Sequence, residues 1–152
     1  MIAYPNHTIG IIVVDHGSKK SAANDQLLEV TELFRRVARA AIVEPAHMEL
    51  AEPTIAQAFD RCVAQGATLV VVHPYFLAPG RHSTADIPRM TAEAAAKHPA
   101  VRFHVTQPLG LDETIAALML RRIEHCLQHD LVCDYCQKTM AAKGPSPTSA
   151  TA

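Results

Sequence analysis

The chain has 152 residues, enough for one ordinary domain with a hydrophobic core of its own. Hydrophobic residues make up 49% of it and charged residues 19%, which is typical of a globular protein and excludes a disordered one. A formal net charge of −1 and 5% aromatic residues without tryptophan argue against a nucleic-acid partner. No apolar run approaches the roughly 20 residues that cross a bilayer, so no membrane partner is expected either.

The first half of the chain alternates between strand and helix patterns. The β-branched run Ile9–Val14 is typical of a strand buried on both faces. Apolar residues over 21–41 follow a helical spacing, and 42–50 is the next strand candidate. Pro53 suits the first turn of a second helix, which Gly66 ends.

The second half repeats the alternation. We expect a strand over 68–72, a helix from about 84 to 98 and a strand over 101–106. Asp112 is placed to cap a last helix. The apolar residues of that helix are expected to face the core: Ile115, Leu118, Met119, Ile123, Cys126 and Leu127.

This order of elements predicts an α/β fold. Strand–helix alternation implies a parallel sheet with helices on both faces, a three-layer sandwich. Four strands and right-handed crossovers favour a flavodoxin-like order 2-1-3-4. The domain is expected to cover residues 1–130. A cysteine-containing extension over 131–140 and a disordered tail over 141–152, rich in Ala, Ser, Thr and Pro, complete the chain.

Histidines and carboxylates gather where the predicted strands end. His16 follows the first strand, Glu49 and Glu52 end the second, and His82 lies in the loop after the third. Ligands bind beyond the carboxyl ends of parallel strands, so these four side chains should converge. Imidazole with carboxylate suits Fe²⁺, Co²⁺ or Ni²⁺ and supplies general bases near neutral pH. Simpler roles stay open: a helix cap for His16, a solvated strand face for Glu49 and a helix-start charge for Glu52.

Three segments carry a resemblance to a known family. Val14-Asp-His-Gly-Ser18, His47-Met-Glu-Leu-Ala-Glu-Pro53 and Pro74-Tyr-Phe-Leu-Ala-Pro-Gly-Arg-His82, with Asp86-Ile-Pro88, follow one another in the chain. Together they resemble the short CbiX-type, or SirB-type, sirohydrochlorin chelatases over roughly residues 9 to 128. The single motifs are weak, whereas the long proline-to-histidine string in order with the others is specific.

The resemblance implies a lyase that inserts Fe²⁺ or Co²⁺ into sirohydrochlorin, in siroheme or cobalamin biosynthesis. The metal is then a substrate, and the chemistry requires no cofactor. Short members of the family resemble half of a larger two-lobed chelatase and work as homodimers. By match of motif, the active-site histidines that meet the metal fall on His16 and His82, and the acidic residues fall on Glu49 and Glu52.

Sirohydrochlorin is an anionic tetrapyrrole with many carboxylate arms, and a chain of net charge −1 must concentrate positive charge to bind it. Candidates for this role lie in or near the loops after the first and third predicted strands: Ser18, Lys19, Arg81 and Arg89. They would act through charge or through backbone N–H groups at a helix start. Ordinary surface charge is the alternative. Met48, Tyr75, Phe76 and Leu77 are candidates for an apolar bed under the ring, although core packing is expected for at least two of them.

The cysteines near the C-terminus are a separate feature. Cys133-x-x-Cys136 has the spacing of a metal or redox hairpin, and Cys126 precedes it. A [2Fe–2S] cluster needs four ligands, which two chains would supply by each donating the Cys133/Cys136 pair. A Zn²⁺ site, a metal-delivery tail and plain thiols remain open.

Two other functions also remain open. A non-catalytic metal carrier or sensor would use the same His/Glu cluster and the cysteine tail. A subunit of a heteromeric chelatase would need a different partner chain. The N-terminus shows no signal-peptide pattern, so a cytoplasmic location is expected.

Overall fold

The structure, a computed structural model, describes residues 2–134, 136 and 137. The chain divides into two compact units, Met1–Gly110 and Leu111–Ala152. The helix of the second unit is α4 (Glu113–Gln128). The first unit contains, in chain order, β1 (Ile9–Asp15), α1 (Ser21–Ala38), β2 (Ile42–His47), α2 (Ile55–Ala64), β3 (Leu69–Pro74), the π-helical turn η1 (His82–Asp86), α3 (Ile87–Ala95) and β4 (Arg102–Val105).

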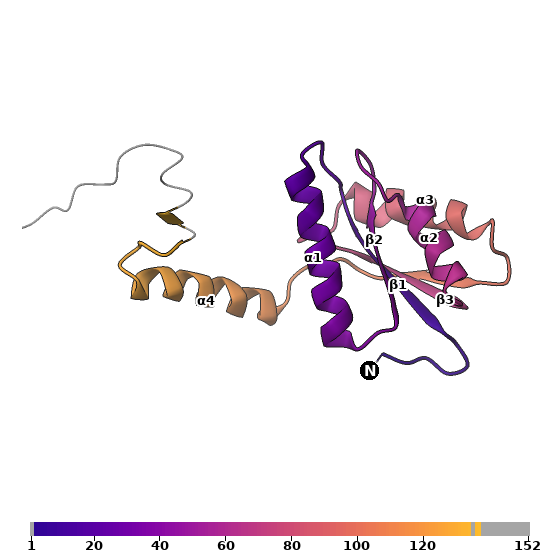
Figure 1. Cartoon of the computed structure of the whole chain (residues 1–152), viewed down its shortest axis with the longest axis horizontal. Helices are drawn as coiled ribbons and strands as arrows, with labels where there is room; N and C mark the ends of the chain where they lie inside the picture. The colour runs from indigo at the N-terminus through magenta and orange to yellow at the C-terminus, as the bar shows by residue number, and fades with distance from the viewer. Residues whose placement is uncertain (1, 135, 138–152) are drawn as a thin grey trace, which may run out of the picture. The chain divides into compact units, whose positions relative to one another are not determined.

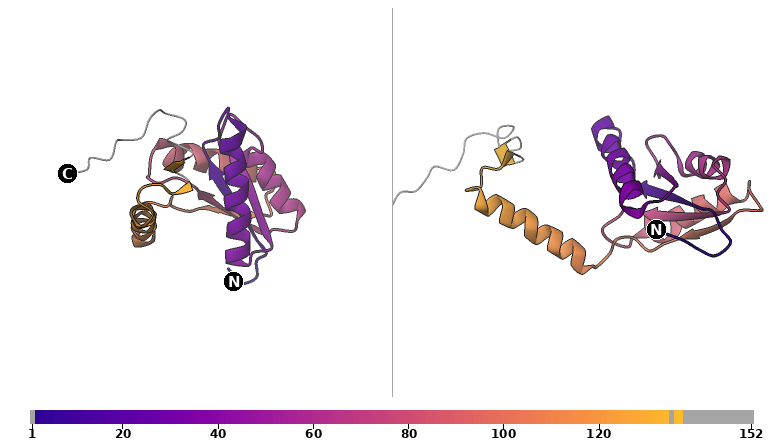
Figure 2. Two further views of the ribbon diagram at one scale, coloured as in Figure 1. Left: turned by 60° about the vertical axis from the view of Figure 1, so that its left-hand side comes forward. Right: turned by 60° about the horizontal axis from the view of Figure 1, so that its bottom comes forward.

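The first unit is built on a four-stranded parallel sheet in the order β2-β1-β3-β4, which confirms the predicted fold class and strand order. Helix α1 covers one face, and α2 and α3 cover the other (Figures 1 and 2). On the α1 face, Leu27 packs with Val13 and Val43. On the other face, Phe59 and Ile87 belong to the larger apolar cluster, so β1 is buried on both sides.

Local sequence explains how α2 starts and how closely it packs. Thr54 and Gln57 form a reciprocal capping box at its N-terminus. On β1, a Cβ added to Gly10 would lie 2.9 Å from the Cβ of Cys62, closer than real Cβ atoms approach. The absence of a side chain at Gly10 therefore lets α2 lie directly against the central strand.

The structure differs from the sequence expectations at several boundaries. The second strand ends at His47 instead of residue 50, because the chain turns and the His47 N–H donates to the carbonyl of Pro53 at 2.7 Å. The helix expected from about residue 84 is preceded by η1, which starts at His82. Helix α4 belongs to the second unit and has no buried residue within that unit, and the inward-facing apolar surface expected for it stays a prediction.

The predicted disordered tail over 141–152, and residues 135 and 138–140 of the predicted extension, lie outside the described residues. Within the part of the chain that the structure describes, no helix combines the length and the hydropathy that crossing a membrane requires.

Candidate metal site at the carboxyl edge of the sheet

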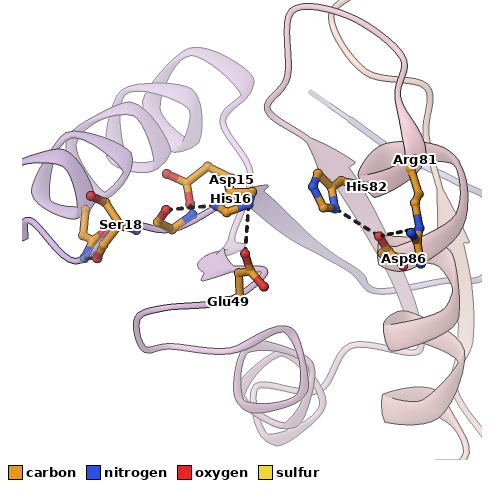
Figure 3. A network of polar contacts seen from close by, with 9 residues as sticks. Asp15, His16, Ser18, Glu49, Arg81, His82 and Asp86 are labelled. Carbon is orange, nitrogen blue, oxygen red and sulfur yellow. Dashed lines mark hydrogen bonds and ion pairs between the residues drawn. The ribbon is translucent and has the colours of Figure 1, made fainter.

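The site lies where β1, β2 and β3 end. The parallel ladder between β1 and β2 continues past the strands, because the Met48 N–H donates to the Asp15 carbonyl and the Glu49 N–H to the His16 carbonyl, at 2.9 and 3.1 Å. This pairing sets Glu49 beside His16. The loop that follows β3 brings His82 to the same edge (Figure 3).

His16 and Glu49 form the closest polar pair of this edge. His16 Nε2 lies 3.0 Å from Glu49 Oε1, and the two side chains are 41% and 53% exposed. The other ring nitrogen, Nδ1, lies 3.2 Å from the carbonyl oxygen of Gly17. Both polar groups are therefore accessible to a ligand that arrives from solvent.

His82 faces His16 across the site. The two ring centroids are 5.2 Å apart and the rings are nearly perpendicular. His82 Nδ1 lies 3.0 Å from Asp86 Oδ2, one turn later in the chain. Arg81 Nε lies 3.9 Å from the same oxygen atom, and its side chain is 85% exposed (Figure 3).

A pair made of a buried histidine and a half-buried aspartate lies next to the turn that carries His16. Asp15 Oδ1 lies 2.6 Å from His47 Nδ1, and the His47 side chain is only 1% exposed. The Gly17 N–H donates to the same carboxylate oxygen at 2.9 Å. Asp15 thus joins the end of β2 to the turn that carries His16. Neither residue is among the site residues predicted from the sequence, although the strand order pairs Asp15 with His47 in register.

The predicted acidic residue Glu52 does not join these polar contacts among the described residues. It is exposed in the loop before α2, and within the described residues it has no hydrogen bond or ion pair. The structure therefore places His16, Glu49 and His82 together and leaves Glu52 apart from their contacts.

The four residues predicted to bind substrate differ in their contacts. Ser18 organises the loop: its N–H donates to Asn24 Oδ1 at 2.9 Å, and its hydroxyl accepts from the Lys20 N–H at 3.0 Å. Lys19 is exposed in that loop, as Arg81 is in its own. Arg89 instead forms an ion pair with Glu93 at 2.7 Å, one turn along α3.

Of the four apolar side chains considered for the bed under the ring, two pack in the core and two are exposed, which agrees with the expected core packing of at least two. Met48 is buried at 6% exposure and Phe76 packs against the core, so these two serve the fold. Tyr75 and Leu77 are 40% and 71% exposed in the loop after β3. An exposed apolar surface thus lies in the segment between β3 and η1, shortly before His82 in the chain.

The spacing of His16 and Glu49 fits a shared cation. The 3.0 Å between His16 Nε2 and Glu49 Oε1 is a hydrogen-bond distance. It is also about the separation of two neighbouring ligand atoms that each lie about 2.1 Å from an octahedral ion. An imidazole and a carboxylate suit borderline divalent ions, and two protein ligands hold such an ion less tightly than a closed thiolate cage.

A second candidate metal site lies in the other unit. The sulfur atoms of Cys126, Cys133 and Cys136 lie 3.2 to 3.6 Å from one another. Hydrogen bonds, chiefly with Cys133 and then with Cys126, raise the pKa of the Cys136 thiol to about 12. The three thiols form the only group of three or more His, Cys, Asp or Glu ligand atoms within 4.8 Å among the described residues.

Comparisons with known proteins agree on one family. The model of the CbiX family matches residues 10–126. A sirohydrochlorin ferrochelatase of the chloroplast from Arabidopsis thaliana is 49% identical over 120 residues, which cover 79% of this chain and 53% of the relative. A sirohydrochlorin cobaltochelatase from Methanosarcina barkeri is 32% identical over 128 residues, which cover 78% of this chain and 97% of that one.

Solved structures show the same likeness. SirB from Bacillus subtilis with Fe³⁺ superimposes with a TM-score of 0.74 and 31% identity over 78% of this chain and 47% of the other. The chain spans about half the length of several of the curated relatives it matches. The family match covers most of the first unit and most of α4. By its sequence and its fold, the chain belongs to the CbiX family.

Proposed function

We propose that this protein is a sirohydrochlorin chelatase that inserts Fe²⁺ or Co²⁺ into the tetrapyrrole. The observation that carries the proposal is the 3.0 Å pair of His16 Nε2 and Glu49 Oε1 with the His82 ring facing it at 5.2 Å. The relatives named as ferrochelatases and cobaltochelatases support the substrate class.

Metal insertion makes three physical demands. The aqueous ion must lose water, two pyrrole N–H groups must lose protons, and the macrocycle must offer its nitrogen lone pairs. His16 and Glu49 hold the incoming ion and replace part of its water shell. His82, on the opposite side, accepts a pyrrole proton at its unprotonated ring nitrogen and passes it to solvent, to which its side chain is 47% exposed.

Positive charge and apolar surface complete the binding site for the tetrapyrrole. Arg81 and Lys19 are exposed in the two loops of the site, and Arg in particular grips carboxylates through two parallel hydrogen bonds. Tyr75 and Leu77 offer apolar contact to the ring. Ser18 contributes through the loop that it organises, whereas Arg89 would have to leave Glu93 to reach a substrate.

The test is an anaerobic spectrophotometric assay with sirohydrochlorin and Fe²⁺, Co²⁺ or Ni²⁺ added separately. We expect metal insertion above the spontaneous rate, with at least about tenfold loss in His16→Ala, Glu49→Gln and His82→Ala. Glu52→Gln tests whether the exposed glutamate contributes. His104→Ala, which removes an exposed histidine of β4, is the control and should keep full activity.

A folded wild-type protein that accelerates insertion of none of these metals would contradict the chelatase proposal. If that protein also bound metal tightly without tetrapyrrole, the non-catalytic carrier would take its place. The cluster of three thiols favours this second candidate, because thiolates retain soft and borderline metal ions.

We further propose that the protein works as a homodimer. The chain spans about half the length of the longer relatives, so two copies would match one of them in length. Sedimentation velocity at assay concentration tests this. An active monomer would contradict it, and activity only with another chain would favour a heteromeric chelatase. A cytoplasmic location stays a prediction, and the Arabidopsis relative is named as chloroplastic.

We propose that Cys126, Cys133 and Cys136 bind a thiophilic metal. Three sulfur atoms within 3.6 Å of one another fit a single ion such as Zn²⁺ with one further ligand, whereas a [2Fe–2S] cluster needs four ligands and hence a second source. Because thiols must lose protons to bind metal, affinity should rise with pH. Metal analysis of the protein and its Cys133→Ser variant distinguishes zinc, iron with sulfide, and no metal; the last outcome contradicts the proposal.

A further inference from the structure

The contact between His82 and Asp86 points to a residue whose role the sequence motifs do not explain. We propose that Asp86 is a positioning residue, which fixes the tautomer and the orientation of His82 so that Nε2 is presented to the metal and the tetrapyrrole. This inference rests on the proposed chelatase function and deepens it, since it assigns the arrangement behind one of the two imidazoles.

The side chain of Asp86 serves His82 and not the adjacent helix. Asp86 precedes α3, a position at which an aspartate commonly caps the helix by accepting a backbone N–H. Its carboxylate makes no such capping bond. Instead, Oδ2 lies 3.0 Å from His82 Nδ1, and Asp86 is less exposed than the histidine, 24% against 47%.

The local backbone produces this pairing. His82 and Asp86 are the first and last residues of η1, in which the Ile87 N–H donates to the His82 carbonyl, five residues earlier. Gly80 and Ser83 tie down the start of the turn, since the Gly80 N–H donates to the Ser83 hydroxyl at 3.0 Å. The π-helical turn therefore holds both side chains on one side of a fixed loop.

Hydrogen-bond chemistry then determines the tautomer. An ionised carboxylate only accepts hydrogen bonds, so in neutral His82 the proton lies on Nδ1 and the lone pair on Nε2. His16 differs, because each of its ring nitrogens faces an acceptor: the Gly17 carbonyl lies 3.2 Å from Nδ1 and Glu49 Oε1 lies 3.0 Å from Nε2. Metal-binding histidines commonly donate their second ring N–H to a carboxylate or a carbonyl group. His82, with its Nδ1 on Asp86, meets this condition.

The other neighbour of Asp86 is a weaker partner. Arg81 Nε lies 3.9 Å from the same carboxylate oxygen, and the Arg81 side chain is 85% exposed. Exposed ion pairs of this length contribute little to stability. The ion pair of Arg81 with Asp86 is thus weak, and the arginine remains accessible to an anionic substrate.

The experiment compares Asp86→Ala, Asp86→Glu and a matched control, Asp60→Ala. The control removes another aspartate–histidine pair, in which Asp60 Oδ1 lies 2.6 Å from His98 Nε2. Neither residue belongs to the site. Three readouts are used: the ¹⁵N chemical shifts of the His82 ring at a pH where the imidazole is neutral, the Kd for Co²⁺ from its absorption spectrum, and kcat and KM for metal insertion.

We expect Asp86→Ala to move the His82 ring from the Nδ1–H tautomer toward the Nε2–H tautomer. We also expect Co²⁺ affinity or kcat to fall by about 10-fold or more, the usual effect of losing a residue that orients a metal-binding histidine. The KM for sirohydrochlorin should change little. Asp86→Glu should restore part of the lost activity, and Asp60→Ala should match the wild type.

An unchanged His82 tautomer in Asp86→Ala, or equal losses in Asp86→Ala and Asp60→Ala, would overturn the inference. The nuclear magnetic resonance readout separates it from the proposed function. If the wild-type protein inserts no metal, the chelatase proposal fails, whereas the ¹⁵N shifts and the Co²⁺ affinity still decide whether Asp86 positions His82.

Discussion

Gly17 is the residue that allows the two sides of the metal pair to meet. Its φ is +84°, and a Cβ at this position would lie 1.9 Å from the carbonyl oxygen of Glu49. The turn after β1 and the turn after β2 therefore touch through their backbones. This contact, with the ladder bond from the Glu49 N–H to His16, holds the imidazole beside the carboxylate.

Gly17→Ala should consequently lower both stability and metal insertion. Gly66 provides a matched control, because its φ is +93° but a Cβ there would meet nothing within 4 Å. Gly66→Ala should reduce the free energy of unfolding by about 1–2 kcal/mol, the cost of left-handed backbone for a residue with a Cβ. Gly17→Ala adds a backbone clash and should cost more than about 3 kcal/mol.

Urea denaturation followed by circular dichroism measures both changes, and the chelatase assay measures the activity. Equal destabilisation by the two substitutions would show that the contact between Gly17 and Glu49 is not as close as described. Full activity in Gly17→Ala, with a normal fold, would show that the spacing of His16 and Glu49 is not decisive for insertion.

At the scale of a single element, α4 is capped at its N-terminus by the side chain of Asp112. The Thr114 N–H donates to Asp112 Oδ1 at 2.7 Å. This hydrogen bond lowers the pKa of the Asp112 carboxyl below its ordinary value. The ionised side chain is the form that caps the helix most strongly, because it also carries a negative charge at the positive end of the helix dipole.

The contribution of this cap should be lost in acid. The pKa of this carboxyl group is lower in the folded state than in the unfolded state, so the group stabilises the folded state fully at pH values above the unfolded pKa of about 3.9. This stabilisation is lost as the pH falls through the lower pKa of the folded state. Amide hydrogen exchange at the start of α4, measured between pH 5 and pH 2 and corrected for intrinsic rates, should show protection falling in this range.

Asp112→Asn is the control for that titration. Asparagine accepts the same backbone N–H but carries no titratable group, so the loss of protection between pH 5 and pH 2 should be smaller in this variant. The same acid-dependent loss in Asp112→Asn would assign the effect to other carboxyl groups.

For the whole first unit, Cys62 reports on the integrity of the core. It lies in α2 against the central strand and is fully buried. Burial, and to a smaller extent the charge of Glu44, raises the pKa of its thiol to about 12. Because the thiolate is the reactive form, neither access nor ionisation favours modification while the core is intact.

We therefore expect Cys62 to react with iodoacetamide only when the unit unfolds. Alkylation at increasing urea, followed by mass spectrometry of the Cys62 peptide, should follow the loss of circular dichroism. Modification of Cys62 in the native protein at the rate seen for Cys126, which is partly exposed, would indicate that the core opens locally.

Much of this architecture could be predicted from the chain alone. Runs such as Ile9–Val14 and the helical spacing over 21–41 depend on local preferences and periodicity, so the elements, the parallel sheet and the strand order followed from them. The rule that ligands bind beyond the carboxyl ends of parallel strands also indicated where His16, Glu49 and His82 meet.

What the chain alone did not determine depends on contacts between distant residues. The pairing of Asp15 with His47 requires the register of two strands, and the contact of Asp86 with His82 requires the π-helical turn. Residue type and spacing do not encode these side-chain directions. Only the tertiary structure decided them, because burial and backbone geometry select which polar groups come within hydrogen-bonding distance.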